Sequence, residues 1–293
     1  MFRKLRLTLE MIKFEHSLFA LPFALTAALL AVRESGLAVP EAAKKLAWII
    51  AAMVGARSAA MTFNRLVDAS SDARNPRTAG RHLPAGLLSR RFAWGFLVAS
   101  CALFLLAAYM LNPLCFRLAP VALALVLSYS FTKRFTSLSH LWLGLCLGVA
   151  PAAAWIAILA SLDLRILWLT AAVTLWTAGF DIIYACQDYH FDRREGLFSL
   201  PCSLGIARAL LAARALHLLM VLCLIALAYS FRLGALSLAG VALVAFLLVW
   251  EHRLVKPHDL SRVNAAFFTA NGWVSVVFLL FWAADILALG SGS

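Results

Sequence analysis

The feature that most limits how this chain can fold is a series of long apolar runs. A helix that crosses the hydrocarbon core of a lipid bilayer needs about 20 mostly apolar residues. Nine such runs occur, at residues 14–32, 46–66, 92–110, 114–131, 138–160, 165–186, 209–230, 233–250 and 265–289. Hydrophobic residues make up 63% of the chain, against roughly 45–50% in soluble domains. The sequence therefore predicts an all-α polytopic membrane protein with nine transmembrane helices. We expect one domain over residues 1–289 and a flexible tail at 290–293.

The Lys and Arg residues are divided unevenly between the two sets of loops that nine helices create. Eighteen of the 26 fall on the side that carries the N-terminus, and six fall on the other side. Loops rich in Lys and Arg stay in the cytoplasm. We therefore expect a multi-pass protein of the inner (cytoplasmic) membrane with a cytoplasmic N-terminus. Most of the net charge of +12 is then explained by topology, which argues against a nucleic-acid partner.

A first group of polar residues lies at the predicted cytoplasmic end of the second helix. Asn64, Asp68 and Asp72 are spaced by four residues, so a helix stacks them on one face. Arg57 extends this face by two turns. Carboxylates spaced by four residues on a helix repel each other, and a hard divalent cation with oxygen ligands removes that repulsion. The pattern indicates a magnesium site.

A second acidic stretch lies at the cytoplasmic end of the sixth predicted helix. Offsets of three, seven and eleven residues predict a single helical face carrying Asp181, Tyr184, Asp188 and Asp192. The two stretches hold five of the 14 acidic residues. Because acids near spanning segments are costly and tend to mark function, we interpret the stretches as two metal sites that bind one diphosphate. We expect this active site to face the cytoplasm.

These stretches resemble motifs of the UbiA superfamily of intramembrane aromatic prenyltransferases. The first matches the family's N-x-x-x-D-x-x-x-D motif, and the second its D-x-x-Y-x-x-x-D-x-x-x-D motif. The loop after the first stretch, residues 77–86, is similar to an R-T-x-x-R-x-L-P-x-G run and contains Arg77 and Arg81. Tyr129 and Lys133 match the family's Y-x-x-x-K motif after the fourth helix. The order of the four motifs also agrees.

The resemblance implies a nine-helix bundle around a central cavity and a Mg²⁺-dependent enzyme. Such an enzyme transfers a polyprenyl group from polyprenyl diphosphate to an aromatic acid acceptor through an allylic carbocation. Many members carry Asp after the motif's Asn, where this chain has Arg65. Arg65 and the run 179–189 resemble the branch that prenylates 4-hydroxybenzoate for ubiquinone or a hydroxynaphthoate for menaquinone. The acceptor, the prenyl chain length and the oligomeric state stay open.

The roles that follow from this interpretation divide the motif residues into three sets. The metal ligands are Asp68, Asp72, Asp188 and Asp192. The substrate-binding residues are Arg57, Asn64, Arg65, Arg77, Arg81 and Tyr129. The catalytic residues are Asp181, Tyr184 and Lys133. Within these sets, Asp181 is expected to accept a hydrogen bond from the acceptor's phenol, and Arg57 to bind the acceptor's carboxylate or to fix Asn64.

Two alternatives compete with this interpretation. Another UbiA-type reaction, on a haem or chlorophyll side chain, is disfavoured by Arg65 and Gln187. A cation-coupled or proton-coupled transporter would have discontinuous helices and ionisable groups near the membrane midplane. Here the polar residues crowd one membrane face, and Arg57 and Asp181 are the only deep charges that we expect. The six Cys and seven His show no metal-ligand spacing and are expected to be packed or interfacial.

Overall fold

The computed structural model describes residues 2–13 and 17–290, and these residues are almost entirely helical. Within those ranges the only β-type pairing is an isolated bridge between Lys256 and Asp259. Eight of the described helices are long and apolar enough to cross a membrane. The predicted all-α membrane fold is confirmed. The chain divides into two compact units, Met1–Ser17 with Ala47–Phe131 and Leu18–Leu46 with Thr132–Ser293.

The first unit is built on one long helix. Its helices are α1 (Phe2–Met11), α3 (Val39–Arg74, from Ala47 onward), α4 (Arg90–Leu111) and α5 (Pro113–Thr132). Gly55 lets α3 approach α4 closely, since a Cβ on Gly55 would lie 2.9 Å from the backbone nitrogen of Phe104. Buried Ala59 and Ala93 continue this small-residue contact. The close packing fixes the position of α3, which carries the first acidic stretch.

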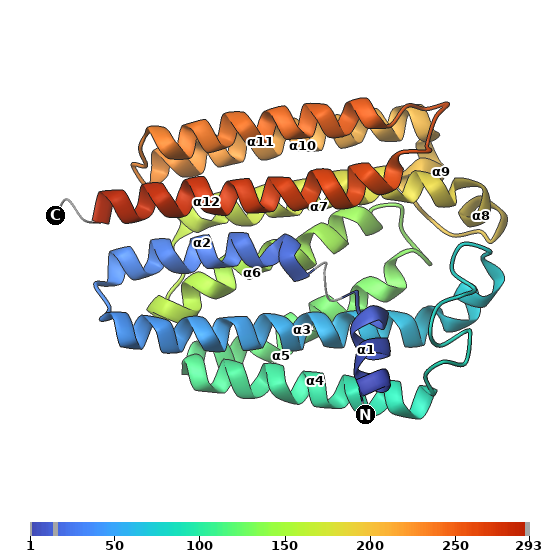
Figure 1. The fold of residues 1–293 in the computed structure, drawn as a ribbon, viewed down its shortest axis with the longest axis horizontal. Helices are drawn as coiled ribbons and strands as arrows, with labels where there is room; N and C mark the ends of the chain where they lie inside the picture. Colours follow the sequence, from blue (N-terminus) through green and yellow to red (C-terminus); the bar gives the residue numbers. More distant parts are fainter. Residues whose placement is uncertain (1, 14–16, 291–293) are drawn as a thin grey trace. The chain divides into compact units, whose positions relative to one another are not determined.

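The second unit contains the remaining helices (Figure 1). They are α2 (Ser17–Ser35), α6 (Ser139–Leu159), η2 (Leu164–Ile166), α7 (Leu167–Ala185), η3 (Cys186–Asp188), α8 (Tyr189–Arg194), α9 (Leu200–Leu204), α10 (Ile206–Ser230), α11 (Ala235–Leu254), η4 (Ala265–Ala270) and α12 (Asn271–Gly290). Helix α7 is the centre of this unit, because it packs against both α6 and α10. Helix α11 in turn packs against α10 and α12.

Small residues also set the distance between α6 and α7. Gly144 and Gly148 both face Thr174 of α7, and a Cβ on Gly148 would lie 2.7 Å from the carbonyl oxygen of Thr170. Gly spaced by four residues is a common device for bringing membrane helices together, because backbone atoms can then pack directly. The consequence for the site is that His140, at the start of α6, lies within hydrogen-bonding distance of Asp181 on α7.

The helices extend beyond several of the predicted apolar runs. The run at 46–66 lies inside α3, which continues through the polar residues up to Arg74. The run at 165–186 continues, through a 3₁₀ turn, to Arg194. The first run, 14–32, corresponds to α2, although its residues 14–16 lie outside the described ranges. Apolar content locates the part of a helix that crosses the membrane, but backbone hydrogen bonding continues the helix into the polar interface.

Candidate functional site

The first acidic stretch lies on α3, which is continuous to Arg74. The predicted shared face of Asn64, Asp68 and Asp72 is therefore helical, as the spacing indicates. The Asn64 Nδ2 group donates a hydrogen bond of 2.8 Å to Asp68 Oδ2. This bond orients the carboxylate along the helix face. Asn64 thus positions the first of the two acids.

Asp72 is held by the loop that follows α3. Its Oδ1 accepts a 2.6 Å hydrogen bond from the Arg81 guanidinium, and its backbone carbonyl accepts one of 3.0 Å from Thr78 Oγ1. The Asp72 side chain is buried, and its Oδ2 accepts no hydrogen bond within the described part of the chain. A buried carboxylate oxygen normally has a partner. This one is chemically suited to a cation.

The same loop contacts α1. His82 Nε2 lies 3.5 Å from Glu10 Oε2, and the Arg6 guanidinium, 2.8 Å from Glu10, holds the pKa of that carboxyl below its usual range. The backbone nitrogen of Arg77 donates 3.0 Å to Asn75 Oδ1, which forms the turn at the start of the loop. These contacts order the loop that carries Arg77 and Arg81.

The two predicted arginines of α3 have different surroundings. Arg65 is buried and donates to Asn64 Oδ1 at 3.5 Å and to the Met11 carbonyl at 3.4 Å. Arg65 therefore has the Asn64-fixing contact that was one of the two roles expected for Arg57. Arg57 donates 3.4 Å to the Lys13 carbonyl, and its buried Nε has no hydrogen-bond partner among the described residues.

The Y-x-x-x-K residues lie at the end of α5. Tyr129 is half-buried, and its hydroxyl lies 3.9 Å from the Met61 sulfur on α3. Lys133 is exposed in the turn that follows α5, and its carbonyl accepts a 2.8 Å hydrogen bond from the backbone nitrogen of Phe198. That bond ties the Lys133 turn to the segment that follows the second acidic stretch.

The second acidic stretch does not lie on one continuous α-helix, so the single-face prediction is wrong in this part. Asp181 and Tyr184 belong to α7, which ends at Ala185. Asp188 lies in the 3₁₀ turn η3, and Asp192 in the short helix α8. A 3₁₀ turn has three residues per turn rather than 3.6, which rotates the last two acids relative to Asp181. Both of them remain buried.

Asp181 has a partner that the sequence pattern did not reveal. His140 Nδ1 lies 2.7 Å from Asp181 Oδ2, and the His140 Nε2 accepts a 3.2 Å hydrogen bond from the backbone nitrogen of Leu200. His140 is only 1% exposed. It fits the expectation of a packed His, but it contacts a predicted catalytic residue. No spacing rule could find it, because the two residues are 41 positions apart.

Aromatic rings gather next to Tyr184 inside the second unit. The Tyr184 and Phe267 ring centroids are 4.3 Å apart, and Phe267 also packs edge-on against Phe180 at 5.3 Å and Phe19 at 5.9 Å. Phe267 comes from the π-helix η4. Such a cluster of ring faces is suited to an apolar chain and to a developing positive charge.

Two buried acids lie outside the predicted site. Glu251 of α11 is fully buried, and its Oε1 accepts a 2.9 Å bond from Asn271 Nδ2. Asp285 of α12 accepts bonds from the Gly234 backbone nitrogen at 2.6 Å and from the Ser237 hydroxyl at 2.7 Å. Asp285 thereby caps the first turn of α11, so its role is structural.

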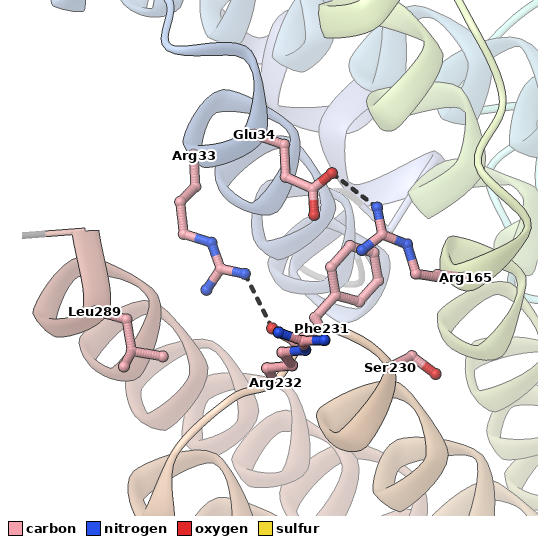
Figure 2. Close-up of a pocket in the computed structure, with 7 residues that line it drawn as sticks. All are labelled: Arg33, Glu34, Arg165, Ser230, Phe231, Arg232 and Leu289. Carbon is pink, nitrogen blue, oxygen red and sulfur yellow. Dashed lines mark hydrogen bonds and ion pairs between the residues drawn. The ribbon is translucent and has the colours of Figure 1, made fainter. Parts of the chain in front are cut away.

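A cavity of about 600 Å³ lies elsewhere in the second unit, at the ends of α2, α10 and α12. Figure 2 shows Arg165 beside Glu34 and Phe231, and Arg33 directed at the Phe231 backbone. Arg165 pairs with Glu34 at 2.7 Å, and Arg33 donates 3.0 Å to the Phe231 carbonyl. None of the predicted site residues lines this cavity. The lining includes three arginines and a single acid, Glu34, and it lacks the paired carboxylates of the acidic stretches, so we do not assign the chemistry to it.

The donor set of the acidic stretches fits a magnesium ion. Within residues 2–13 and 17–290, no group of three or more His, Cys, Asp or Glu side chains could hold a metal ion. Mg²⁺ needs only one or two protein carboxylates, because waters and substrate phosphate oxygens complete its ligands. The buried Oδ2 of Asp72 provides one such oxygen. The end of α3 therefore fits a cation whose remaining ligands are waters or phosphate oxygens.

Comparison with known proteins agrees with this geometry. A sequence model of the UbiA prenyltransferase family matches residues 20–287. The 4-hydroxybenzoate octaprenyltransferase of Vibrio atlanticus is 32% identical over 232 residues, which cover 77% of this chain and 81% of that protein. The apo structure of a UbiA homologue from Aeropyrum pernix K1 is 35% identical, with a TM-score of 0.83 over 92% of this chain and 98% of that one.

A UbiA homologue from Archaeoglobus fulgidus, solved with GPP and Mg²⁺ bound, has a TM-score of 0.75 over 96% of this chain and 99% of that one. At 21% identity, this likeness shows the fold alone. The family match covers most of the chain, and the Vibrio relative supports it independently. The chain therefore belongs to the UbiA prenyltransferase family.

Proposed function

We propose that this protein transfers a polyprenyl group from polyprenyl diphosphate to 4-hydroxybenzoate or a hydroxynaphthoate, in the biosynthesis of ubiquinone or menaquinone. The observation that carries the proposal is the acidic end of α3, where Asn64 orients Asp68 and the buried Asp72 keeps one oxygen without a hydrogen-bond partner among the described residues. The Vibrio relative, which is named for octaprenyl transfer to 4-hydroxybenzoate, supports this acceptor class.

The donor half of the reaction depends on charge. Asp68 and Asp72 would hold one Mg²⁺, and Asp188 and Asp192 would hold another. Mg²⁺ supplies Lewis-acid stabilisation of the diphosphate as a leaving group. Arg65, Arg77, Arg81 and Lys133 add positive charge where negative charge develops. The homologue from Archaeoglobus fulgidus, which binds GPP and Mg²⁺, has this fold and so offers a precedent.

Arg81 has a double role in this proposal. In the structure it neutralises Asp72 through the 2.6 Å hydrogen bond. With a cation held by Asp72, the Arg81 guanidinium would be available to a phosphate oxygen, for which its planar fork is well suited. Binding of the metal and diphosphate therefore exchanges one partner of Arg81 for another without leaving a buried charge unpaired.

The acceptor half of the reaction uses deeper residues. The donor's C–O bond breaks, the electron pair leaves with the diphosphate, and the allylic carbocation is shielded by ring faces such as those beside Tyr184. Asp181 accepts a hydrogen bond from the phenol and makes the acceptor ring richer in electrons. Arg57 binds the acceptor's carboxylate. The ring carbon beside the hydroxyl forms the new C–C bond and then passes its proton to the released diphosphate or to water.

We further propose that residues 1–289 act as a single prenyltransferase domain in the inner membrane, with the N-terminus and the active site on the cytoplasmic side. The distribution of Lys and Arg supports this orientation. The prenyl tail leaves the site sideways into the bilayer, where hydrocarbon is not exposed to water. The long apolar helices make such an exit compatible with the surrounding lipid.

The proposal is tested by a defined reconstitution. Purified protein is incubated with Mg²⁺, a polyprenyl diphosphate and, one at a time, 4-hydroxybenzoate, a hydroxynaphthoate and benzoate, which lacks the hydroxyl. The expected products carry the prenyl chain on the ring of a hydroxylated acid, as read by mass spectrometry, and benzoate gives none. Absence of any prenylated aromatic acid would overturn the proposal. The hydroxylated acid that is used more efficiently identifies the acceptor.

A further inference from the structure

The environment of His140 determines which of its ring nitrogens carries a proton. The backbone nitrogen of Leu200 can only donate, so His140 Nε2, 3.2 Å away, must present a lone pair. The proton of the neutral ring therefore sits on Nδ1, which donates to Asp181 Oδ2 at 2.7 Å. Both nitrogens of this buried ring are satisfied, and its orientation is fixed from two sides.

A neutral donor has a different effect on a carboxylate from that of a cation. Arg81 brings a positive charge to Asp72, whereas the His140 ring, whose Nε2 accepts from Leu200, orients Asp181 without adding a charge. The other oxygen, Asp181 Oδ1, has no hydrogen-bond partner within the described part of the chain, and the side chain of Asp181 is 20% exposed. One oxygen is thus anchored, and the other remains able to accept a hydrogen bond from a hydroxyl group.

The Leu200 end of this chain of contacts belongs to the segment that follows the second acidic stretch. The backbone nitrogen of Leu197 donates 2.8 Å to the Asp192 carbonyl, and that of Phe198 donates 2.8 Å to the Lys133 carbonyl. Residues 197–200 therefore contact the backbone of a proposed metal ligand, the backbone of a proposed phosphate-binding Lys and the ring of His140. This segment is therefore connected to Asp181 through the two hydrogen bonds of His140.

We propose that His140 is a positioning residue for Asp181, and that the Leu200 N–H sets the His140 tautomer that makes it one. This inference rests on the proposed function, in which Asp181 accepts the acceptor's phenolic hydrogen bond. Without the Nδ1 donor, Asp181 loses its anchored orientation. Without the Leu200 donor, the His140 proton can move to Nε2. The lone pair on Nδ1 then faces Asp181 and repels its carboxylate. In both cases the reaction of the aromatic acid is impaired, and binding of the diphosphate is not.

Leu200 allows an unusually clean test, because it is the first residue of α9 and follows the N-cap Ser199. Proline is tolerated at this helix position, and the extended backbone of Ser199, with φ −148° and ψ 159°, is what a residue before proline requires. Leu200→Pro removes the N–H, whereas Leu200→Ala keeps it and removes side-chain packing. Only Leu200→Pro should lower kcat/KM for the aromatic acid, by roughly 10-fold or more, with KM for the diphosphate nearly unchanged.

A second pair of variants replaces the His140 ring itself. His140→Ala should lower kcat/KM for the aromatic acid by roughly 100-fold. His140→Asn, whose amide can replace the Nδ1 donor, should recover part of that loss. The exposed His258 provides the matched control, His258→Ala, which should behave as wild type. Folding of each variant is checked by its thermal transition, and the His140 pair decides the question if Leu200→Pro does not fold.

The inference is overturned if His140→Ala matches wild type, if His140→Asn is no better than His140→Ala, or if the two Leu200 variants are impaired equally. It is also overturned if both substrates lose affinity together, which would indicate a structural role for His140. These results differ from a failure of the proposed function, in which the wild-type protein itself prenylates no aromatic acid.

Discussion

Replacing Arg57 with Ala should separate acceptor binding from donor binding. Arg57 lies seven residues before Asn64 on the continuous α3, which is about 10 Å along the helix axis. It is therefore too deep to be a diphosphate ligand if Asn64 borders the metal site. The guanidinium has several N–H donors, and among the described residues its one hydrogen bond is the 3.4 Å contact with the Lys13 carbonyl. Its buried Nε remains without a partner among the described residues.

A hydrogen bond to a charged group contributes about 1.5–3 kcal/mol. Arg57→Ala should therefore raise KM for the aromatic acid by roughly 10–100-fold and leave KM for the diphosphate nearly unchanged. Arg57→Lys keeps the charge but not the planar fork, so it should fall between Ala and wild type. Arg117→Ala, at an exposed position of α5, is the control. Initial rates are measured with each substrate varied in turn. Equal weakening of both substrates would refute the assignment of Arg57 to the acceptor.

Three further predictions follow from the same structure. Asp72→Asn should raise the apparent KM for the diphosphate or abolish turnover, while binding of the aromatic acid, measured separately, is retained; unchanged donor kinetics would exclude Asp72 as a ligand. Gly148→Ala, whose Cβ would meet Thr174 Oγ1 and the Thr170 carbonyl, should destabilise the protein by about 1–3 kcal/mol, seen as a lower thermal transition; an unchanged transition would contradict the close α6–α7 packing. Introduced cysteines in residues 70–85 and 193–205 should be labelled from the cytoplasmic side and one at residue 235 from the opposite side; labelling of the two acidic loops from opposite faces would break the shared-site proposal.

The parts of this molecule that sequence could predict are those encoded by a local period. Apolar runs located the spanning helices, and spacing by four placed Asn64, Asp68 and Asp72 on one face of α3 because that helix is uninterrupted. The same rule failed after Ala185, where the chain tightens into a 3₁₀ turn. Gln187 Nε2 donates 3.3 Å to the Tyr184 carbonyl there. A local contact between a side chain and the backbone cannot be predicted from the spacing of polar residues along the sequence.

The remaining features depend on contacts between distant residues. His140 lies beside Ser139 at the start of a mostly apolar helix, and the Gly-mediated approach of α6 to α7 brings it to Asp181. Glu251 belongs to none of the sequence motifs, and its partner Asn271 begins a different helix. A pattern within one helix cannot report which face of a neighbouring helix it meets. Both residues became interpretable only once the packing was known.

The central claim is that metal-bound diphosphate drives prenylation of an aromatic acid. It is tested most directly by following product formation in the purified protein as the divalent metal is removed with a chelator and then restored. The account predicts that the prenylated acid disappears with the chelator, returns with Mg²⁺ or Mn²⁺, and does not return in Asp72→Asn or Asp188→Asn variants that still fold. Full product formation in excess chelator would contradict the account.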